Sequence, residues 1–160
     1  MPRSRSKPQA HLRKAMVADA KPIYHLIGQS AQKNEMLARS LSDIYECVRD
    51  FHMCEDDGRV VGCCALHMTW EDMAEIRSVI VDGSSRGKGI GTALVRRCIA
   101  EAKGLGITRI FVLTYIPLYF QRLGFREVSK DVLPHKVWSE CVKCAKFPDC
   151  GETAMILEKL

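Results

Sequence analysis

The feature that most constrains this chain is a glycine-rich loop between a strand-like segment and a helix-like segment. Residues 74–81 are rich in β-branched side chains, which predicts a strand. Apolar residues recur at helical spacing over residues 94–102, which predicts an amphipathic helix. The loop between them reads Arg86-Gly87-Lys88-Gly89-Ile90-Gly91-Thr92. Alternate glycines let several backbone N–H groups converge at the positive end of the helix, so the loop suits a pyrophosphate.

Other glycine-rich loops fit this segment less well. A Walker loop needs Gly-x4-Gly-Lys-Ser/Thr, which residues 83–89 do not supply. A dinucleotide fingerprint needs Gly-x-Gly-x-x-Gly near the start of a βαβ unit, whereas these glycines alternate halfway along the chain. A plain strand-to-helix turn is the alternative to an anion site.

Arg86-x-x-Gly89-x-Gly91 resembles the acetyl-CoA loop of the GCN5-related N-acetyltransferase (GNAT) superfamily, whose signature is Arg/Gln-x-x-Gly-x-Gly/Ala. The similarity extends over residues 12–160. It implies an α/β (α+β) fold with a central mixed, mostly antiparallel twisted sheet, flanked by helices and splayed into a V at the acetyl-CoA site. Acetyl-CoA would be the co-substrate, held by residues 86–92. A backbone N–H between Val79 and Val81 would meet the thioester oxygen.

The pattern predicts one domain over residues 12–160, after a disordered basic arm at residues 1–11. Asp57-Gly58 predicts a hairpin turn, followed after the second strand by a loop over residues 67–73. The residues predict strands over residues 51–55, 59–66, 74–81, 125–130 and 152–158. The resemblance implies further strands at residues 12–15 and 108–114, and helices at residues 19–29 and 119–125.

Composition favours a small cytoplasmic enzyme. The sequence has no run of about 18 apolar residues, so it predicts no membrane span. The basic N-terminus has no apolar signal segment. The net charge of +5 suits an anionic cofactor. We read the short basic run as a solvated tail rather than as a nucleic-acid site.

An incoming ammonium must lose its proton before it can attack a thioester. Glu75 is the candidate general base, because its Ala-Glu-Ile segment, eleven residues before Arg86, resembles the strand that bears the catalytic glutamate in the histone-acetyltransferase branch of the superfamily. Burial of a carboxyl group beside an apolar sheet can raise its pKa toward neutrality, which suits this role. The alternative is an ion pair with Arg77, two residues away on the same face of the strand.

Tyr119 is the candidate general acid, because a phenol is protonated at neutral pH and can protonate a leaving thiolate. The superfamily's usual tyrosine matches Phe120, so Tyr119 is displaced by one residue, about 100° around a helix. Tyr115 is a further candidate. The alternative is that Tyr119 packs at a helix end.

The acceptor is predicted from a second resemblance, to the acetyltransferase domain of bacterial N-acetylglutamate synthases, over residues 62–66, 109–114 and 119–125. It implies L-glutamate as substrate and a role in arginine biosynthesis. Two carboxylates require cationic anchors, for which we select Arg39, Arg77 and Lys136. The alternatives are another amine, from an amino acid, a polyamine or a protein, and a silent acetyl-CoA sensor. A homodimer is an open alternative to a monomer.

The chain has eight cysteines. Five of them lie among apolar residues and are expected to behave as small core side chains. His135, Cys141, Cys144 and Cys150 offer zinc-ligand chemistry, but their spacing lacks a second paired motif, so no metal is assigned and free thiols are the alternative.

Overall fold

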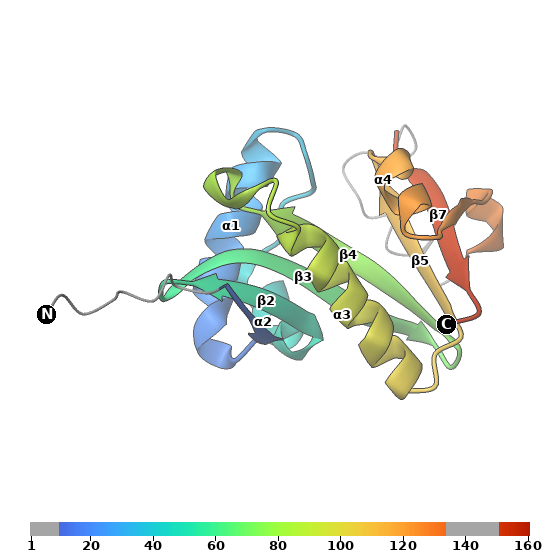
Figure 1. Ribbon diagram of the computed structural model, residues 1–160, viewed down its shortest axis with the longest axis horizontal. Helices are drawn as coiled ribbons and strands as arrows, with labels where there is room; N and C mark the ends of the chain where they lie inside the picture. Colours follow the sequence, from blue (N-terminus) through green and yellow to red (C-terminus); the bar gives the residue numbers. More distant parts are fainter. Residues whose placement is uncertain (1–9, 134–150) are drawn as a thin grey trace, which may run out of the picture. The chain divides into compact units, whose positions relative to one another are not determined.

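The computed structural model describes residues 10–133 and 151–160. In those residues it contains the strands β1 (His11–Lys14), β2 (Phe51–Asp56), β3 (Arg59–Trp70), β4 (Met73–Val81), β5 (Arg109–Thr114), β6 (Arg126–Glu127) and β7 (Thr153–Glu158). The α-helices are α1 (Ala20–Gln32), α2 (Leu41–Glu46), α3 (Ile90–Gly104) and α4 (Pro117–Arg122) (Figure 1). None of these helices combines the length and apolar character that crossing a membrane requires.

The strands form a seven-stranded sheet in the order β1-β2-β3-β4-β5-β7-β6. β4 and β5 are parallel, as expected for strands joined through a helix, and β5–β7, β6–β7 and β1–β2 are antiparallel. The sheet is therefore mixed and contains one βαβ unit, β4-α3-β5. The described residues fall into two compact units, one with residues 10–64 and 78–95, the other with residues 65–77, 96–133 and 151–160.

In the first unit, the β2–β3 hairpin turns at two residues with left-handed backbone, Asp57 (φ 51°) and Gly58 (φ 75°). These angles are what a two-residue hairpin turn requires, so the Asp-Gly prediction is confirmed. α1 buries one apolar face at helical spacing, through Ala20, Ile23, Leu26 and Ile27.

Gly62 on β3 brings a strand unusually close to α3 within the first unit. A Cβ added at this position would lie 3.1 Å from Leu94 Cδ1 and 3.2 Å from both the Ile80 carbonyl oxygen and Ile90 Cγ2. Only glycine avoids this crowding. The first turns of α3 therefore pack directly against β3.

In the second unit, a core cluster of Met73, Phe111, Leu133, Ala154 and Ile156 joins β4, β5 and β7. The ladder between β4 and β5 pairs Met73, Ala74 and Glu75 with residues 109–111 and then ends. β5 continues to pair with β7 as far as Thr114. The ladder between the two parallel strands thus stops at the position of Glu75.

Two element predictions were wrong in detail, and one helix was not predicted. The loop expected at residues 67–73 is strand, because β3 runs to Trp70 and β4 begins at Met73 after a two-residue turn. At the end of β3, the alternation of buried Thr69 and exposed Trp70 suits an extended backbone. The late strand expected at residues 125–130 is only Arg126–Glu127, because Lys130–Val132 forms a 3₁₀ turn. α2 was not predicted, since its short apolar pattern gives little periodicity.

Candidate active site

The glycine-rich loop of the first unit connects β4 to α3 through a short 3₁₀ turn, η3 (Gly83–Ser85). Gly87 and Gly89 both have φ of 78°, in the left-handed region that other residues rarely adopt. An added Cβ at either position would meet nothing within 4 Å, so backbone conformation, and not crowding, requires these glycines.

α3 begins directly after the second of these glycines. The Ala93 N–H donates to the Gly89 carbonyl at 3.0 Å, which closes the first helical turn. The N–H groups of a first turn point away from the helix body, at its positive end. Two left-handed glycines followed directly by a helix N-terminus are compatible with the anion site predicted from the sequence, which stays a prediction.

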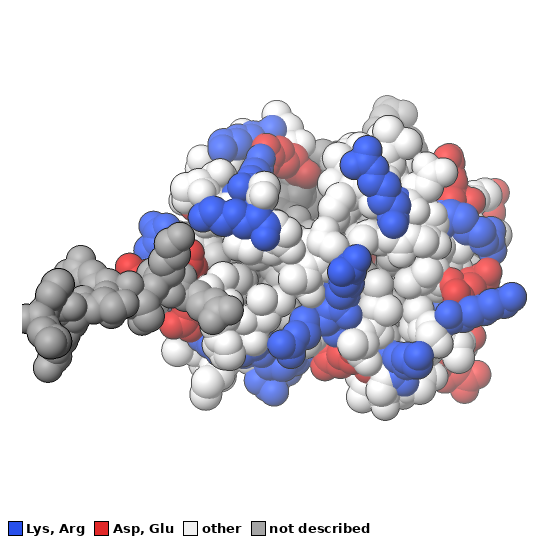
Figure 2. Space-filling model, in the orientation of Figure 1, with Lys and Arg blue, Asp and Glu red and all other residues white. Residues whose placement is uncertain are grey.

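Arg86 is held by two acceptors within the first unit. Its Nε donates to the Val81 carbonyl at 3.2 Å, and its Nη2 lies 3.0 Å from a carboxylate oxygen of Glu35. The Arg86 guanidinium lowers the pKa of the Glu35 carboxyl below its ordinary value, and the Ser30 hydroxyl contributes in the same direction. Figure 2 shows basic and acidic side chains together on this surface, over the end of α1 and the loop before α3.

Glu75 and Arg77 form an ion pair on β4, in the second unit. Arg77 Nε lies 2.5 Å from Glu75 Oε2, and only 12% and 10% of the respective side chains are exposed. Residues two apart on a strand share a face, which explains the contact. The ion pair that the sequence offered as the alternative to a general base is therefore present. A candidate base and a candidate substrate anchor are direct neighbours.

Ser78 interrupts the regular geometry of β4 just after this pair. Its φ is 53°, a left-handed conformation inside a strand, and its carbonyl lies 3.5 Å from Cys63 Sγ. Such a residue turns the neighbouring peptide groups away from a regular ladder. Val79 and Val81, the predicted backbone donors, follow it and are half-buried. No sequence signal pointed to Ser78, because serine has no preference for this conformation.

Tyr119 lies on α4 and is half-buried. Its ring packs edge-on against Phe120 at a centroid distance of 5.1 Å, and Phe120 packs in the same way against Phe125 at 5.4 Å. Phe120 is 2% exposed, so it takes the core position on this helix. Tyr115 precedes α4 and is exposed.

The three proposed acceptor anchors fall in different parts of the chain. Arg39 is half-buried in the connection between α1 and α2, in the first unit, and Arg77 is in the second unit. Lys136 lies outside the described residues, as do His135, Cys141, Cys144, Cys150 and residues 1–9.

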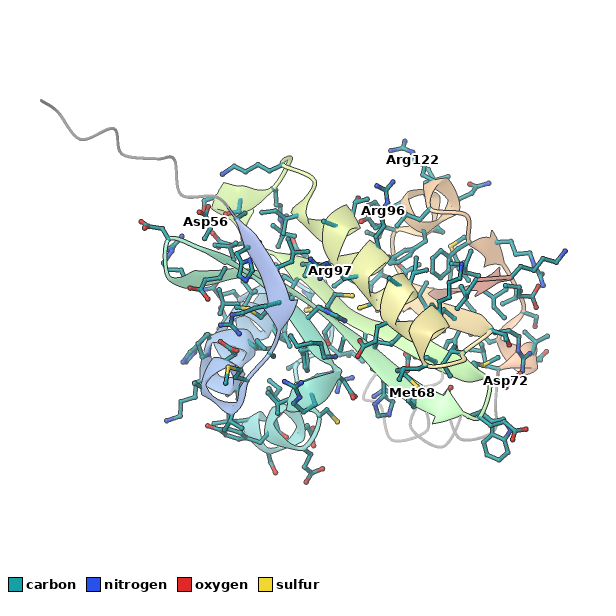
Figure 3. The ribbon with its side chains drawn as sticks, turned by 60° about the horizontal axis from the view of Figure 1, so that its bottom comes forward. Asp56, Met68, Asp72, Arg96, Arg97 and Arg122 are labelled. Atoms are coloured by element: carbon teal, nitrogen blue, oxygen red, sulfur yellow. The ribbon has the colours of Figure 1, made fainter. Side chains whose placement is uncertain are left out.

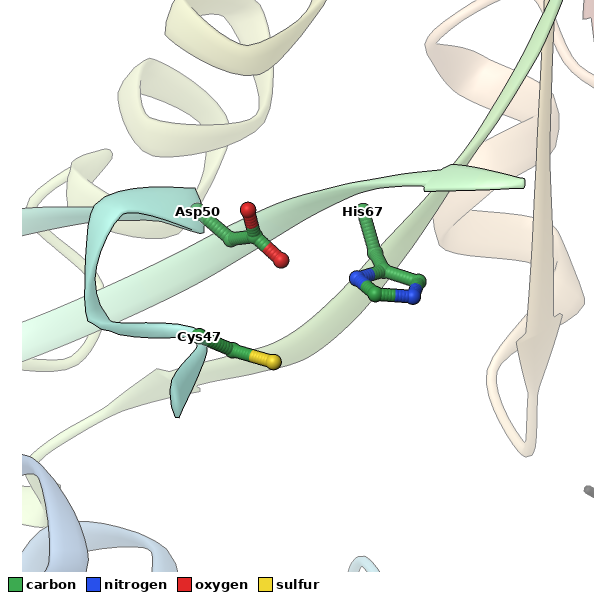
Figure 4. Close-up of side chains that lie close together, drawn as sticks. All are labelled: Cys47, Asp50 and His67. Carbon is green, nitrogen blue, oxygen red and sulfur yellow. The ribbon is translucent and has the colours of Figure 1, made fainter. Parts of the chain in front are cut away.

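Of the five cysteines predicted to lie in the core, Cys54, Cys63, Cys64 and Cys98 are buried, whereas Cys47 is only half-buried, so the prediction is wrong for Cys47. Burial raises the pKa of the Cys54 thiol, which keeps it protonated at neutral pH. Figure 4 shows Cys47 and Asp50, from the segment that joins α2 to β2 in the first unit, and His67, from β3 in the second. Because these residues belong to different units, they define no metal site within either.

Exposed arginines also lie on the helices of the second unit. Arg96 and Arg97 project from α3 and Arg122 from α4 (Figure 3), and all three are exposed.

The glycine loop, with two left-handed residues, lies between a strand and a helix, as in the sequence pattern that resembles the GNAT acetyl-CoA loop. The chain belongs to the Acetyltransferase (GNAT) family, whose family profile matches residues 18–125. It is therefore an N-acetyltransferase that uses acetyl-CoA to acetylate an amine.

Two relatives are similar over most of their length. An uncharacterized N-acetyltransferase of Chlorobaculum tepidum is 39% identical over 145 residues, which cover 91% of this chain and 94% of that protein. An amino-acid acetyltransferase of Mycobacterium tuberculosis is 39% identical over 132 residues, covering 81% of this chain and 75% of that one.

Solved structures give the same fold. A Mycobacterium tuberculosis protein in complex with CoA and the ligand NLQ matches with a TM-score of 0.80 and 35% identity, over 94% of this chain and 99% of that one. N-acetylglutamate synthase from Neisseria gonorrhoeae, complexed with coenzyme A and N-acetyl-glutamate, matches with a TM-score of 0.86 and 25% identity. That match covers 97% of this chain and 36% of the synthase, so the chain spans about a third of that protein.

Proposed function

We propose that the protein transfers the acetyl group of acetyl-CoA to the α-amine of L-glutamate, as the first step of arginine biosynthesis in the cytoplasm. The observation that carries this proposal is the fold that the chain shares, with a TM-score of 0.86 and 25% identity, with an N-acetylglutamate synthase. The amino-acid acetyltransferase relative supports an amino acid as acceptor.

The reaction proceeds by direct attack in a ternary complex. Glu75 accepts a proton from the ammonium group, and the neutral amine attacks the thioester carbon. A C–N bond forms, the C–S bond breaks, and the coenzyme leaves as a thiolate that Tyr119 protonates. Tyr115 and solvent are the other proton donors considered for this last step.

Backbone groups supply the remaining stabilisation. An N–H between Val79 and Val81 donates to the thioester oxygen, where negative charge develops in the transition state. The left-handed Ser78 supports this role, because it turns the peptide groups beside it. Residues 86–92 hold the pyrophosphate of the coenzyme.

Cationic side chains hold the acceptor. Arg77 and Arg39, together with Lys136, bind the two carboxylates of glutamate. Guanidinium groups suit this task because they can donate two parallel hydrogen bonds to one carboxylate. For the oligomeric state, a homodimer remains an alternative to a monomer.

The test is release of free thiol from acetyl-CoA across a panel of amines, comparing L-glutamate with L-aspartate, L-glutamine, lysine and spermidine. Rapid turnover with glutamate alone is expected. Turnover with another amine and none with glutamate would discard the substrate while keeping the reaction type. Coenzyme binding without turnover on any amine would favour the sensor alternative.

A glycine substitution tests the loop separately. Gly89→Val forces a β-branched residue into a φ of 78°, so coenzyme binding should weaken by about 100-fold or more. Gly83→Val is the matched control, because Gly83 lies outside the left-handed region with open space around it. Calorimetric titration with coenzyme A measures both variants. Equal binding by the two would remove Gly89 from the coenzyme site.

A further inference from the structure

Glu35 places a carboxylate beside the glycine-rich loop. The residue follows the end of α1, where Asn34 adopts a left-handed φ of 56°. The Glu35 N–H donates to the Ser30 carbonyl and the Asn34 N–H to the Ala31 carbonyl, at 3.1 and 3.0 Å. This is the hydrogen-bond pattern of a Schellman helix end, which fixes the backbone of Glu35 to α1.

The carboxylate of Glu35 is engaged as well. It accepts a hydrogen bond from Nη2 of Arg86, 51 residues further along the chain, at 3.0 Å. The Glu35 carboxylate thus lies next to Arg86, the arginine of the Arg-x-x-Gly-x-Gly signature. A negative charge there opposes the binding of another anion to the same guanidinium.

We propose that Glu35 competes with the pyrophosphate of the coenzyme for Arg86, and thereby weakens coenzyme binding and speeds its release. The inference rests on the assignment of residues 86–92 to the coenzyme. It adds a residue that sets the affinity of that site.

The exposure of the pair makes this competition feasible. The Arg86 and Glu35 side chains are 52% and 41% exposed, and an ion pair so open to water contributes little to folding. The more highly charged pyrophosphate can therefore displace the carboxylate. Glu35 alternatively orients Arg86 for the ligand, as the second anchor beside the Val81 carbonyl. The two roles predict opposite changes in affinity when the charge of Glu35 is removed.

Calorimetric titration with coenzyme A distinguishes them. Glu35→Gln should bind about three- to tenfold more tightly than the wild type, with a slower dissociation rate and a steeper loss of affinity with salt. Glu35→Asp retains the charge and should bind like the wild type. Glu46→Gln, at an exposed glutamate on α2 in the same unit, is the control for a general change of charge.

A double-mutant cycle tests whether Glu35 acts through Arg86. In an Arg86→Gln background, Glu35→Gln should leave coenzyme affinity unchanged. Weaker binding by the single Glu35→Gln variant would establish orientation and overturn the proposal. Tighter binding that persists without Arg86, or that Glu46→Gln reproduces, would overturn it too. If the wild type fails to bind coenzyme A, the loop assignment itself is wrong, which is a separate outcome.

Discussion

Two carboxylates, one in each unit, are buried to the same degree but are engaged in different ways. Asp19 is 7% exposed and Glu75 is 8% exposed, and each pairs with an arginine of its own unit. Asp19 accepts from both terminal nitrogens of Arg13, at 2.7 and 2.9 Å, and from the Met16 N–H at 2.7 Å. These contacts close the turn between β1 and α1.

Glu75 pairs instead with Arg77 on the same strand, two residues away. That ion pair lies within one strand. Burial of a carboxylate by itself therefore does not distinguish a folding role from a chemical one. We expect Asp19 to matter for stability and Glu75 for turnover, and the following experiments test this contrast.

The largest expected effect is on turnover in Glu75→Gln. Loss of a general base should lower kcat by about 10²–10⁴-fold and shift the pH–rate profile upward, because only amine already deprotonated in solution can then react. Steady-state rates from pH 6 to 10 measure this, with coenzyme affinity as a check on folding. Glu127→Gln, an exposed glutamate on β6, is the control. An unchanged pH–rate profile would remove Glu75 from the mechanism.

A smaller effect is expected from Arg77→Gln. Loss of one carboxylate anchor should raise the KM for L-glutamate by about 10–100-fold, while the KM for acetyl-CoA stays constant. Arg39→Gln should act in the same direction. If Arg77 serves only as the partner of Glu75, kcat will fall instead and the KM for glutamate will not change. A change in the KM for L-glutamate therefore indicates a substrate anchor, and a change in kcat indicates a partner of Glu75.

Asp19→Asn should affect stability and leave kcat within about twofold of the wild type. Loss of a charge-assisted hydrogen-bond network should lower the free energy of unfolding by about 2 kcal/mol. Urea unfolding followed by circular dichroism measures it, with Glu46→Gln as the exposed control in the same unit. A large loss of kcat in correctly folded Asp19→Asn protein would contradict the contrast drawn above.

The smallest effect concerns pH. Hydrogen bonds from Arg13 hold the pKa of Asp19 below its ordinary value of 3.8. A carboxyl with a depressed pKa in the folded state stabilises the protein above its unfolded pKa, and this contribution is lost as pH falls through the folded value. The stability difference between wild type and Asp19→Asn should therefore be constant above about pH 5 and shrink below pH 4. A difference that stays constant down to pH 2 would exclude this linkage.

Local sequence patterns predicted most of the elements that carry the site. The β-branched segment before the loop is β4, and the alternate glycines do begin a helix, with two of them in the left-handed region. These features depend on residues close together in the chain, whose backbone preferences are strong. The Glu75–Arg77 contact could be anticipated for the same reason, because strand periodicity alone puts both side chains on one face.

Contacts between distant segments could not be predicted in this way. No pattern indicated that β7 inserts between β5 and β6, or that the β4–β5 ladder ends at Glu75. The pairing of Glu35 with Arg86 likewise depends on where the end of α1 lies in the folded first unit.

The sequence by itself determined the glycine-loop chemistry, the hairpin and the family resemblance, because each is encoded in short stretches of backbone preference. Only the tertiary structure decided which charged side chains meet at the loop, and which of the neighbours Tyr119 and Phe120 lies in the core. Phe120, rather than Tyr119, is buried against Phe125. The physical reason is that side-chain partners are set by packing between segments, and the free energy of that packing is distributed over residues far apart in the chain.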